Sequence, residues 1–277
     1  MSVQATRSFN SESRTIVYEI FDAVASWRAE NKQTIIFHHG VAMDRKMWAD
    51  WLPPLFGNYR IVLFDMFGCG ESQSFQNEAD WSPQARVRDV LALADEVGAG
   101  EFHMVGESYG GTIALMTALR APERISSLTV TNASHVGSSI RNISWWRQLI
   151  DEEGMEGWAR RMMEDRFFPD TLTPAMAEWY LERQATTTKE SVLSILRELV
   201  KVDLTDKVGA IATPSLLLHG DSSPFVSVPI MDDLKNRLKN AQLKVFPRAR
   251  HGLPFSHGDK CGKAVSEFLA EITARKA

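Results

Sequence analysis

The amino-acid sequence predicts an α/β protein whose central sheet is mostly parallel and which carries an inserted helical segment. Two observations predict this. Short apolar runs rich in β-branched residues alternate with stretches of helical periodicity, and such alternation implies crossover connections with helices on both faces of the sheet. Between residues 134 and 207 the alternation stops, and only helical stretches rich in tryptophan, phenylalanine and methionine remain.

The elements follow one another in a regular order. Two short strands are expected between Thr6 and Ile20, with a turn at residues 10–13. Six further strands are expected at Thr34–His38, Arg60–Phe64, Phe102–Val105, Ser127–Val130, Ser215–Leu218 and Gln242–Phe246. Helices are expected at Gln84–Val97, Thr112–Leu119, Ile230–Lys239 and Lys260–Thr273. A core of residues 1–133 and 208–277 with a helical cap of residues 134–207 is therefore predicted, and the active site is expected beyond the carboxyl ends of the strands.

Composition excludes several classes of function. The net charge of −4 leaves no basic footprint for nucleic acid, and no uncharged apolar stretch is long enough to span a bilayer. Residues 1–10 lack the pattern of a signal peptide, so a cytoplasmic protein is expected. The two cysteines, Cys69 and Cys261, stand outside any metal-spaced cluster, and nothing in the sequence demands a metal or an organic cofactor. The expected partner is a small-molecule substrate.

The most informative motif is Gly-Glu-Ser-Tyr-Gly-Gly at residues 106–111. It joins a predicted strand to a predicted helix, so Ser108 is expected on a sharp turn that pushes its hydroxyl above the sheet. The backbone N–H of Tyr109, at the start of the helix, is expected to face the same space. After an earlier strand, the turn at residues 38–41 would bring the Val41 N–H opposite it, and these two donors form a candidate oxyanion hole.

A general base is expected late in the chain. His251 follows the last predicted strand on a loop, from which an imidazole can reach over the sheet edge and accept the serine proton. Among the other histidines, His39 is expected to be structural and His38 to line the pocket wall. The segment Asp65–Ser72, with the pattern D-x-x-G-x-G-x-S, is expected to be a tight scaffolding turn.

Taken in order, these motifs resemble those of the α/β-hydrolase superfamily over almost the whole chain. The resemblance implies the α/β-hydrolase fold, a Ser108 nucleophile and a His251 base. In most members the triad acid is the third residue after the loop glycine, which is Gly220 here, and that residue is Ser223. Three alternatives remain: Asp221 reaches His251, Asn132 orients the histidine from the end of the strand before the cap, or the acid is lost and the enzyme is weak or repurposed.

Within the superfamily, the segments His39–Trp48 and Asp203–Asp206 look like those of 3-oxoadipate enol-lactonases. This likeness implies a serine hydrolase that acts through an acyl-enzyme on a small ester, lactone or amide, with a carboxylated substrate as one option. Related families imply other options: carbon–carbon bond hydrolysis, lyase or cofactor-free dioxygenase chemistry with His251 as base, or a ligand receptor. Cap aromatic residues are expected to line the pocket, and an inward-pointing cap arginine would clamp a carboxylate. The aromatic candidates are Trp145, Trp158 and Phe168, and the arginines are Arg141, Arg147, Arg160, Arg161 and Arg166.

Overall fold

The computed structural model describes residues 2–3, 5–72, 80–140 and 143–275. One sheet runs through the molecule in the order β1-β3-β5-β4-β6-β7-β8-β9, with β2 paired to β3. Every pair from β5 to β9 is parallel, whereas β1, β2 and β3 pair antiparallel. The predicted α/β architecture with a mostly parallel sheet is confirmed.

The strands form where the apolar runs predict them, apart from the two-residue strand β1, which was not predicted. In the middle of the sheet they are buried on both faces, as parallel strands usually are, and every residue of β6 is buried. The strands are β1 (Ser2–Val3), β2 (Arg7–Ser11), β3 (Arg14–Asp22), β4 (Gln33–His38), β5 (Tyr59–Phe64), β6 (Phe102–Glu107), β7 (Ile125–Thr131), β8 (Ser215–Gly220) and β9 (Ala241–Phe246).

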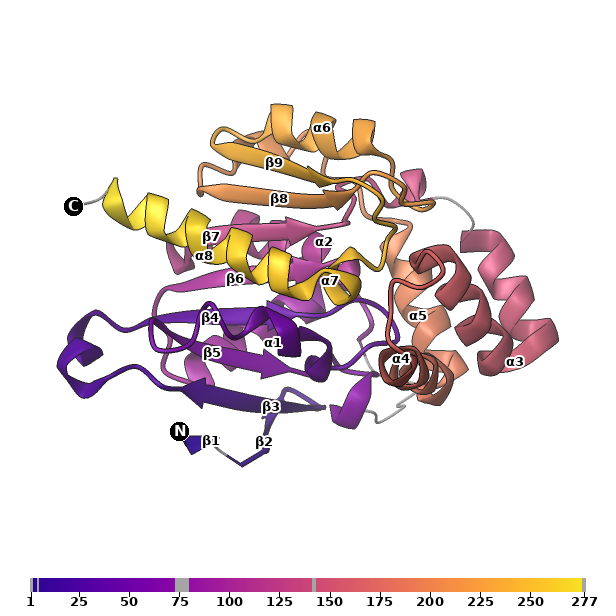
Figure 1. Cartoon of the computed structure of the whole chain (residues 1–277), viewed down its shortest axis with the longest axis horizontal. Coiled ribbons are helices and arrows are strands. Elements are labelled where there is room, and N and C mark those ends of the chain that lie inside the picture. The colour runs from indigo at the N-terminus through magenta and orange to yellow at the C-terminus, as the bar shows by residue number, and fades with distance from the viewer. Residues whose placement is uncertain (1, 4, 73–79, 141–142, 276–277) are drawn as a thin grey trace.

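Helices cover both faces of this sheet. On one face α8 packs against β8 and the 3-10 helix η2 (Arg45–Trp51), and Figure 1 shows α8 crossing in front of the strands. Elsewhere α1 packs on α2, which in turn packs on β6 and β7. The core helices are α1 (Pro83–Glu96), α2 (Tyr109–Arg120), α6 (Val228–Arg237), α7 (Leu253–Ser256) and α8 (Gly258–Ala274).

Three helices lie in sequence between β7 and β8, where the helical cap is predicted. They are α3 (Ile143–Arg166), α4 (Pro174–Thr186) and α5 (Lys189–Leu199). Gly154 interrupts α3 with a φ of 69°, a left-handed conformation that glycine adopts without strain. In Figure 1 these helices stand beside the ends toward which the parallel strands point, so they roof the edge where the site is expected.

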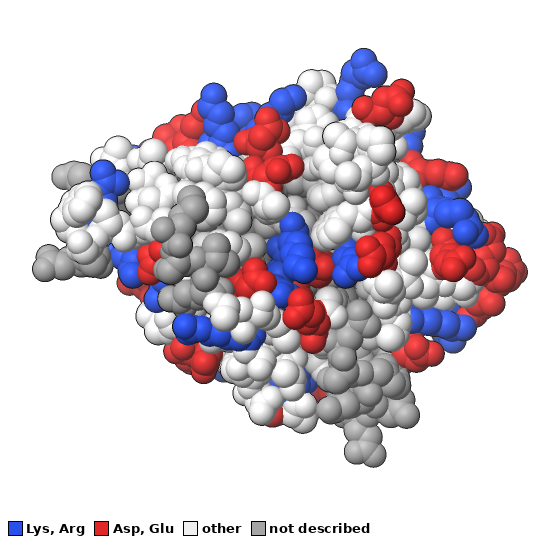
Figure 2. Space-filling view, turned by 60° about the horizontal axis from the view of Figure 1, so that its bottom comes forward, with Lys and Arg blue, Asp and Glu red and all other residues white. Residues whose placement is uncertain are grey.

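The charged surface is mixed rather than divided by sign. On the face shown in Figure 2, lysine and arginine side chains lie interspersed with aspartate and glutamate. Within the described residues, no helix is both long and apolar enough to cross a membrane.

Candidate active site

Ser108 lies on a strained turn between β6 and α2. Its φ of 53° and ψ of −118° are unfavourable for a residue with a side chain. The turn is tight: a Cβ on Gly106 would lie 2.3 Å from the Gly110 carbonyl oxygen, and a Cβ on Gly110 would lie 2.2 Å from that of His38. Both flanking positions therefore require glycine, which explains the spacing in the motif.

His251 reaches this serine from the loop between β9 and α7. Its Nε2 lies 3.1 Å from Ser108 Oγ, within hydrogen-bond distance. The side chain is buried, and its ring packs edge-on against Phe225 with ring centroids 4.9 Å apart. Geometrically, the imidazole can take the proton of the Ser108 hydroxyl.

Ser223 occupies the other side of the imidazole. Its Oγ lies 3.1 Å from His251 Nδ1 and also accepts the Val226 N–H at 3.4 Å. When Nε2 accepts from Ser108, Nδ1 carries the hydrogen and donates it to Ser223 Oγ. A neutral hydroxyl therefore contacts the ring nitrogen for which the sequence predicted Asp221 or Asn132 as the partner.

Asp221 does not reach the imidazole, which corrects the first alternative. Its carboxylate accepts the backbone N–H groups of Arg248 at 3.0 Å and of Ala249 at 3.3 Å, together with the hydroxyl of Ser222. These bonds turn the side chain toward the backbone of the loop that precedes His251. Asp221 thus caps that loop instead of contacting the ring.

Asn132 holds the histidine loop through the backbone, so the second alternative is also corrected. Its Nδ2 donates to the His251 carbonyl at 2.7 Å, and its Oδ1 accepts from the Gly220 N–H at 3.1 Å. With both ends of the amide engaged, Asn132 fixes where the His251 backbone sits and does not orient its ring.

A narrow cavity opens between this pair and the cap. Val41 and Tyr109, the predicted oxyanion-hole residues, both line it. Because Tyr109 is the first residue of α2, its N–H has no carbonyl in the preceding turn to bond. The lining residues are Val41, Ser108, Tyr109, Thr112, Asn132, Ala133, Ile140, Trp146, Trp158, Arg166, Leu196, Leu199, Phe225, Val226 and His251.

Of the cap residues predicted to bind substrate, the structure brings Trp158 to this cavity. Trp145 is 39% exposed and stacks under the Arg161 guanidinium, whose Cζ lies 4.9 Å from its ring. Phe168 lies under Arg250 on a separate groove, with the Arg250 Cζ 4.3 Å from its ring. The prediction that these two line the cavity is wrong, because helical spacing alone does not show which cap face turns inward.

His38 also lies outside the lining. It is buried behind the turn, where its Nδ1 contacts the His39 carbonyl at 2.8 Å and its ring packs on Phe64. His39 is structural as expected, since its Nε2 accepts the Met66 N–H at 2.9 Å.

Burial sets the protonation of the ionisable groups around the site. It lowers the pKa of His251 well below the usual value, with the Arg166 guanidinium and then His219 acting in the same direction. Burial also raises the pKa of the Cys69 thiol to about 12, so this thiol stays protonated and is a poor nucleophile. Among the described residues, no group of three or more histidine, cysteine, aspartate or glutamate side chains is arranged to hold a metal ion.

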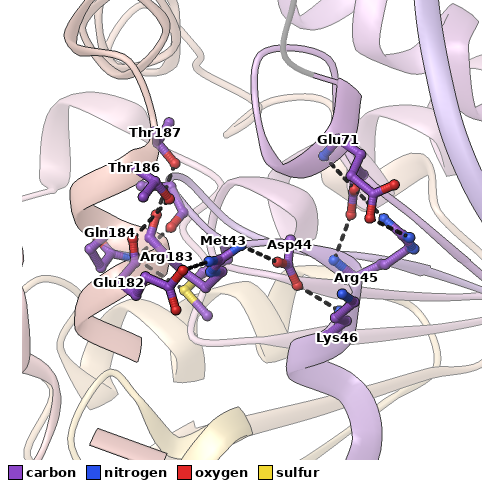
Figure 3. A network of polar contacts seen from close by, with 12 residues as sticks. Met43, Asp44, Arg45, Lys46, Glu71, Glu182, Arg183, Gln184, Thr186 and Thr187 are labelled. Carbon is purple, nitrogen blue, oxygen red and sulfur yellow. Dashed lines mark hydrogen bonds and ion pairs between the residues drawn. The ribbon is translucent and has the colours of Figure 1, made fainter. Parts of the chain in front are cut away.

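The cap is tied to the loop that carries Val41. Gln184 in α4 donates to the Ala42 carbonyl at 2.8 Å and accepts the Trp158 indole N–H at 2.9 Å. Beside it, Arg183 lies 3.6 Å from the Asp44 carboxylate (Figure 3). These contacts join the turn that follows Val41, the cavity-lining Trp158 and helix α4 in one network.

Comparisons with known proteins identify the family of this fold. The family described as alpha/beta hydrolase fold matches residues 33–258, which is most of the chain. The chain belongs to this family. The predicted resemblance to the α/β-hydrolase superfamily is confirmed.

Named relatives of this α/β-hydrolase are hydrolases. The 3-oxoadipate enol-lactonase 1 of Acinetobacter baylyi is 25% identical over 88% of this chain and 91% of its own length. A 2-hydroxy-6-oxononadienedioate/2-hydroxy-6-oxononatrienedioate hydrolase of Paraburkholderia xenovorans is 23% identical over 87% of this chain and 88% of its own. The crystal structure of the enol-lactonase from Burkholderia xenovorans shares the fold, with a TM-score of 0.86, 21% identity and coverage of 95% of this chain and 100% of that one.

Proposed function

We propose that this α/β-hydrolase cleaves a small ester, lactone or amide through an acyl-enzyme formed on Ser108. The observation that carries the proposal is the 3.1 Å contact between Ser108 Oγ and His251 Nε2, made by a serine held in a strained turn. In support, the Acinetobacter baylyi relative is named an enol-lactonase.

The proposed steps use four residues that line the cavity, together with Ser223, which contacts His251. Ser108 Oγ attacks the carbonyl carbon while its proton passes to His251 Nε2, and the N–H groups of Val41 and Tyr109 bind the developing oxyanion. The imidazolium then gives the proton to the leaving group. Water, deprotonated by the same histidine, releases the acyl group, and Ser223 keeps the imidazole in the orientation that both steps need.

Labelling with a fluorophosphonate tests this proposal. Intact-mass measurement of the wild type is expected to show one adduct, absent from Ser108→Ala, and small p-nitrophenyl esters are expected to be hydrolysed only by the wild type. Undiminished turnover by a folded Ser108→Ala variant would rule out the covalent route.

A second candidate is hydrolysis of a carbon–carbon bond, with His251 acting as base on the substrate. The relative from Paraburkholderia xenovorans favours it, because the substrate in its name carries hydroxyl, keto and carboxylate groups and no ester. Activity on such an enol that survives Ser108→Ala but not His251→Ala would identify this chemistry. An oxygen requirement would instead indicate a dioxygenase, and tight binding without turnover a receptor.

The proposal also covers the cellular compartment and the partner. We propose a cytoplasmic enzyme whose partner is its small-molecule substrate, and the cavity beside Ser108 supports such a partner.

A further inference from the structure

Arg166, the last residue of α3, places a buried guanidinium in the wall of the active-site cavity. Its side chain is 6% exposed, and its Nε has no hydrogen-bond partner among the described residues. The Phe225 ring lies near both this guanidinium and the His251 base: its centroid is 5.9 Å from the Arg166 Cζ and 4.9 Å from the centroid of the His251 ring. The Arg166 carbonyl accepts the Gly252 N–H at 2.9 Å, which fixes the end of α3 beside the histidine loop.

The protein compensates this positive charge only in part. The paired carboxylate, on Glu107, lies 4.0 Å away, beyond hydrogen-bond distance. Burial raises the pKa of Glu107 to about 7 even though Arg166 acts to lower it, so the carboxyl group is about half protonated at neutral pH. A buried cation with an unused donor and an incomplete counter-charge is costly unless a ligand completes it.

Within the part of the chain that the structure describes, no carboxylate hydrogen-bonds the ring of His251, the base beside this cation. The ionisable and polar groups that face His251 are Ser108, Ser223, His219 and Arg166, which are neutral or positive. The imidazolium formed during acyl transfer therefore lacks the carboxylate that stabilises it in sites of the Ser-His-Asp type.

One negatively charged group could balance the Arg166 guanidinium and also stabilise the His251 imidazolium. Given the hydrolase function proposed above, we propose that Arg166 binds a carboxylate of the substrate, and that this carboxylate supplies the negative charge which Ser223 does not. A carboxylate on Arg166 forms charge-assisted hydrogen bonds and offsets the field of the guanidinium at His251. The carboxylate is not consumed, since the proton still moves from Ser108 to His251 and on to the leaving group.

The substrate class that follows is a small anionic ester or lactone, such as a half-ester of a dicarboxylic acid. A substrate carboxylate is expected to change KM and kcat for different reasons. Binding to Arg166 lowers KM, whereas the offset of charge beside the imidazolium arises in the transition state and raises kcat.

Monomethyl glutarate and dimethyl glutarate test the proposal, because they share a skeleton and differ by one charge. The wild type is expected to prefer the monoester by about tenfold or more in kcat/KM. Arg166→Gln is expected to lose that preference, measured as the ratio of kcat/KM for the monoester to kcat/KM for the diester, and Arg166→Lys to keep part of it. Arg161→Gln is the matched control, because Arg161 lies on the same helix but is 41% exposed and paired with Asp165.

The second half of the proposal is tested by Ser223→Asp, which builds in the missing carboxylate. In that variant the ratio of kcat for the monoester to kcat for the diester is expected to fall toward one, whereas the lower KM for the monoester is expected to remain. An unchanged preference in kcat would overturn the claim that the substrate supplies the charge. A wild type without preference, or a preference that survives Arg166→Gln, would overturn the carboxylate site itself.

Calorimetry with glutarate separates this inference from the proposed hydrolase function. If neither ester is turned over and Ser108 takes no fluorophosphonate, the hydrolase function fails. Glutarate binding to the wild type that is lost in Arg166→Gln would still support the carboxylate site. Equal binding by both proteins, or by neither, would reject it.

Discussion

Replacing Ser223 by aspartate is expected to make this enzyme faster on neutral esters. The Ser223 Oγ already lies 3.1 Å from His251 Nδ1, and the Val226 N–H donates to the same atom, so a carboxylate placed there finds two donors. The change puts a negative charge next to the ring that becomes an imidazolium during acyl transfer.

The size of the effect follows from the type of hydrogen bond exchanged. A bond between neutral groups contributes about 0.5–1.5 kcal/mol and one to a charged group about 1.5–3 kcal/mol. The difference of about 1–2 kcal/mol applies mainly to the transition state, where the ring is charged, and corresponds to a rate increase of about 5–30-fold. The new carboxylate also raises the pKa of His251, which burial and Arg166 hold well below the usual value.

The assay is kcat/KM for a neutral p-nitrophenyl ester across pH, for the wild type, Ser223→Asp and Ser223→Asn. Asparagine matches aspartate in size and lacks the charge, so it controls for packing. Aspartate is expected to raise the plateau and to move the acidic limb of the profile to higher pH, whereas asparagine does neither. If aspartate moves the limb without raising the plateau, charge beside the ring does not limit the rate. If the aspartate and asparagine variants behave alike, residue 223 does not govern the imidazole.

Three further predictions concern packing and pH. Gly252→Ala would place a Cβ 2.1 Å from the Phe167 ring, so it is expected to lower the free energy of unfolding by about 1–3 kcal/mol in denaturant titrations and to reduce ester turnover. Gly209→Ala is the control, because the nearest atom to its Cβ would lie at 3.7 Å, and it is expected to change neither quantity. Gln184→Met leaves the Ala42 carbonyl and the Trp158 indole N–H unpaired, and each loss is expected to lower the free energy of unfolding by about 1–3 kcal/mol. A variant that unfolds in urea with the same free energy as the wild type would contradict the role of Gln184. Burial lowers the pKa of His38 to about 3 and that of His219 to about 4. Below about pH 6.5 these histidines are therefore protonated in the unfolded state but stay neutral in the folded state. Stability is therefore lost as pH falls below about 6.5, by about 2 kcal/mol per histidine at pH 5, and His219→Asn should flatten this dependence in denaturant titrations at pH 7 and 5.

The sequence predicted the sheet, its helices and the Ser108–His251 pair because each rests on a local signal. The alternation of apolar and helical runs places the strands, and Gly106 and Gly110 mark a turn that no larger residue permits. The choice between Asp221 and Ser223 has no such signal, since both follow Gly220 and only the path of the loop decides which side chain meets the ring. A tertiary contact of this kind becomes visible only when the histidine loop is in place.

The cap residues were harder to predict for the same reason. Trp145 and Trp146 are adjacent in sequence, yet Trp145 is 39% exposed whereas Trp146 is buried and packs on Phe225 at 4.8 Å. Gly154 interrupts α3, so its apolar residues do not follow one continuous helical period. The sequence pattern therefore does not show which side of the helix faces the cavity. Arg166 turns inward because it ends α3 against the histidine loop. Arg141, which precedes α3 in the sequence, lies outside the described residues.

The position of Arg166 also joins the cap to the chemistry. Its carbonyl accepts the N–H of Gly252, the residue after His251, and its guanidinium and the His251 ring both lie against the Phe225 ring. A shift of the end of α3 would therefore move the histidine loop and the positive charge together. On the other side of the cavity, Gln184 links α4 to the carbonyl next to Val41. These contacts couple the end of α3 to the histidine loop and α4 to the turn that carries Val41, so a substitution that moves either helix is expected to disturb the residues that line the cavity as well.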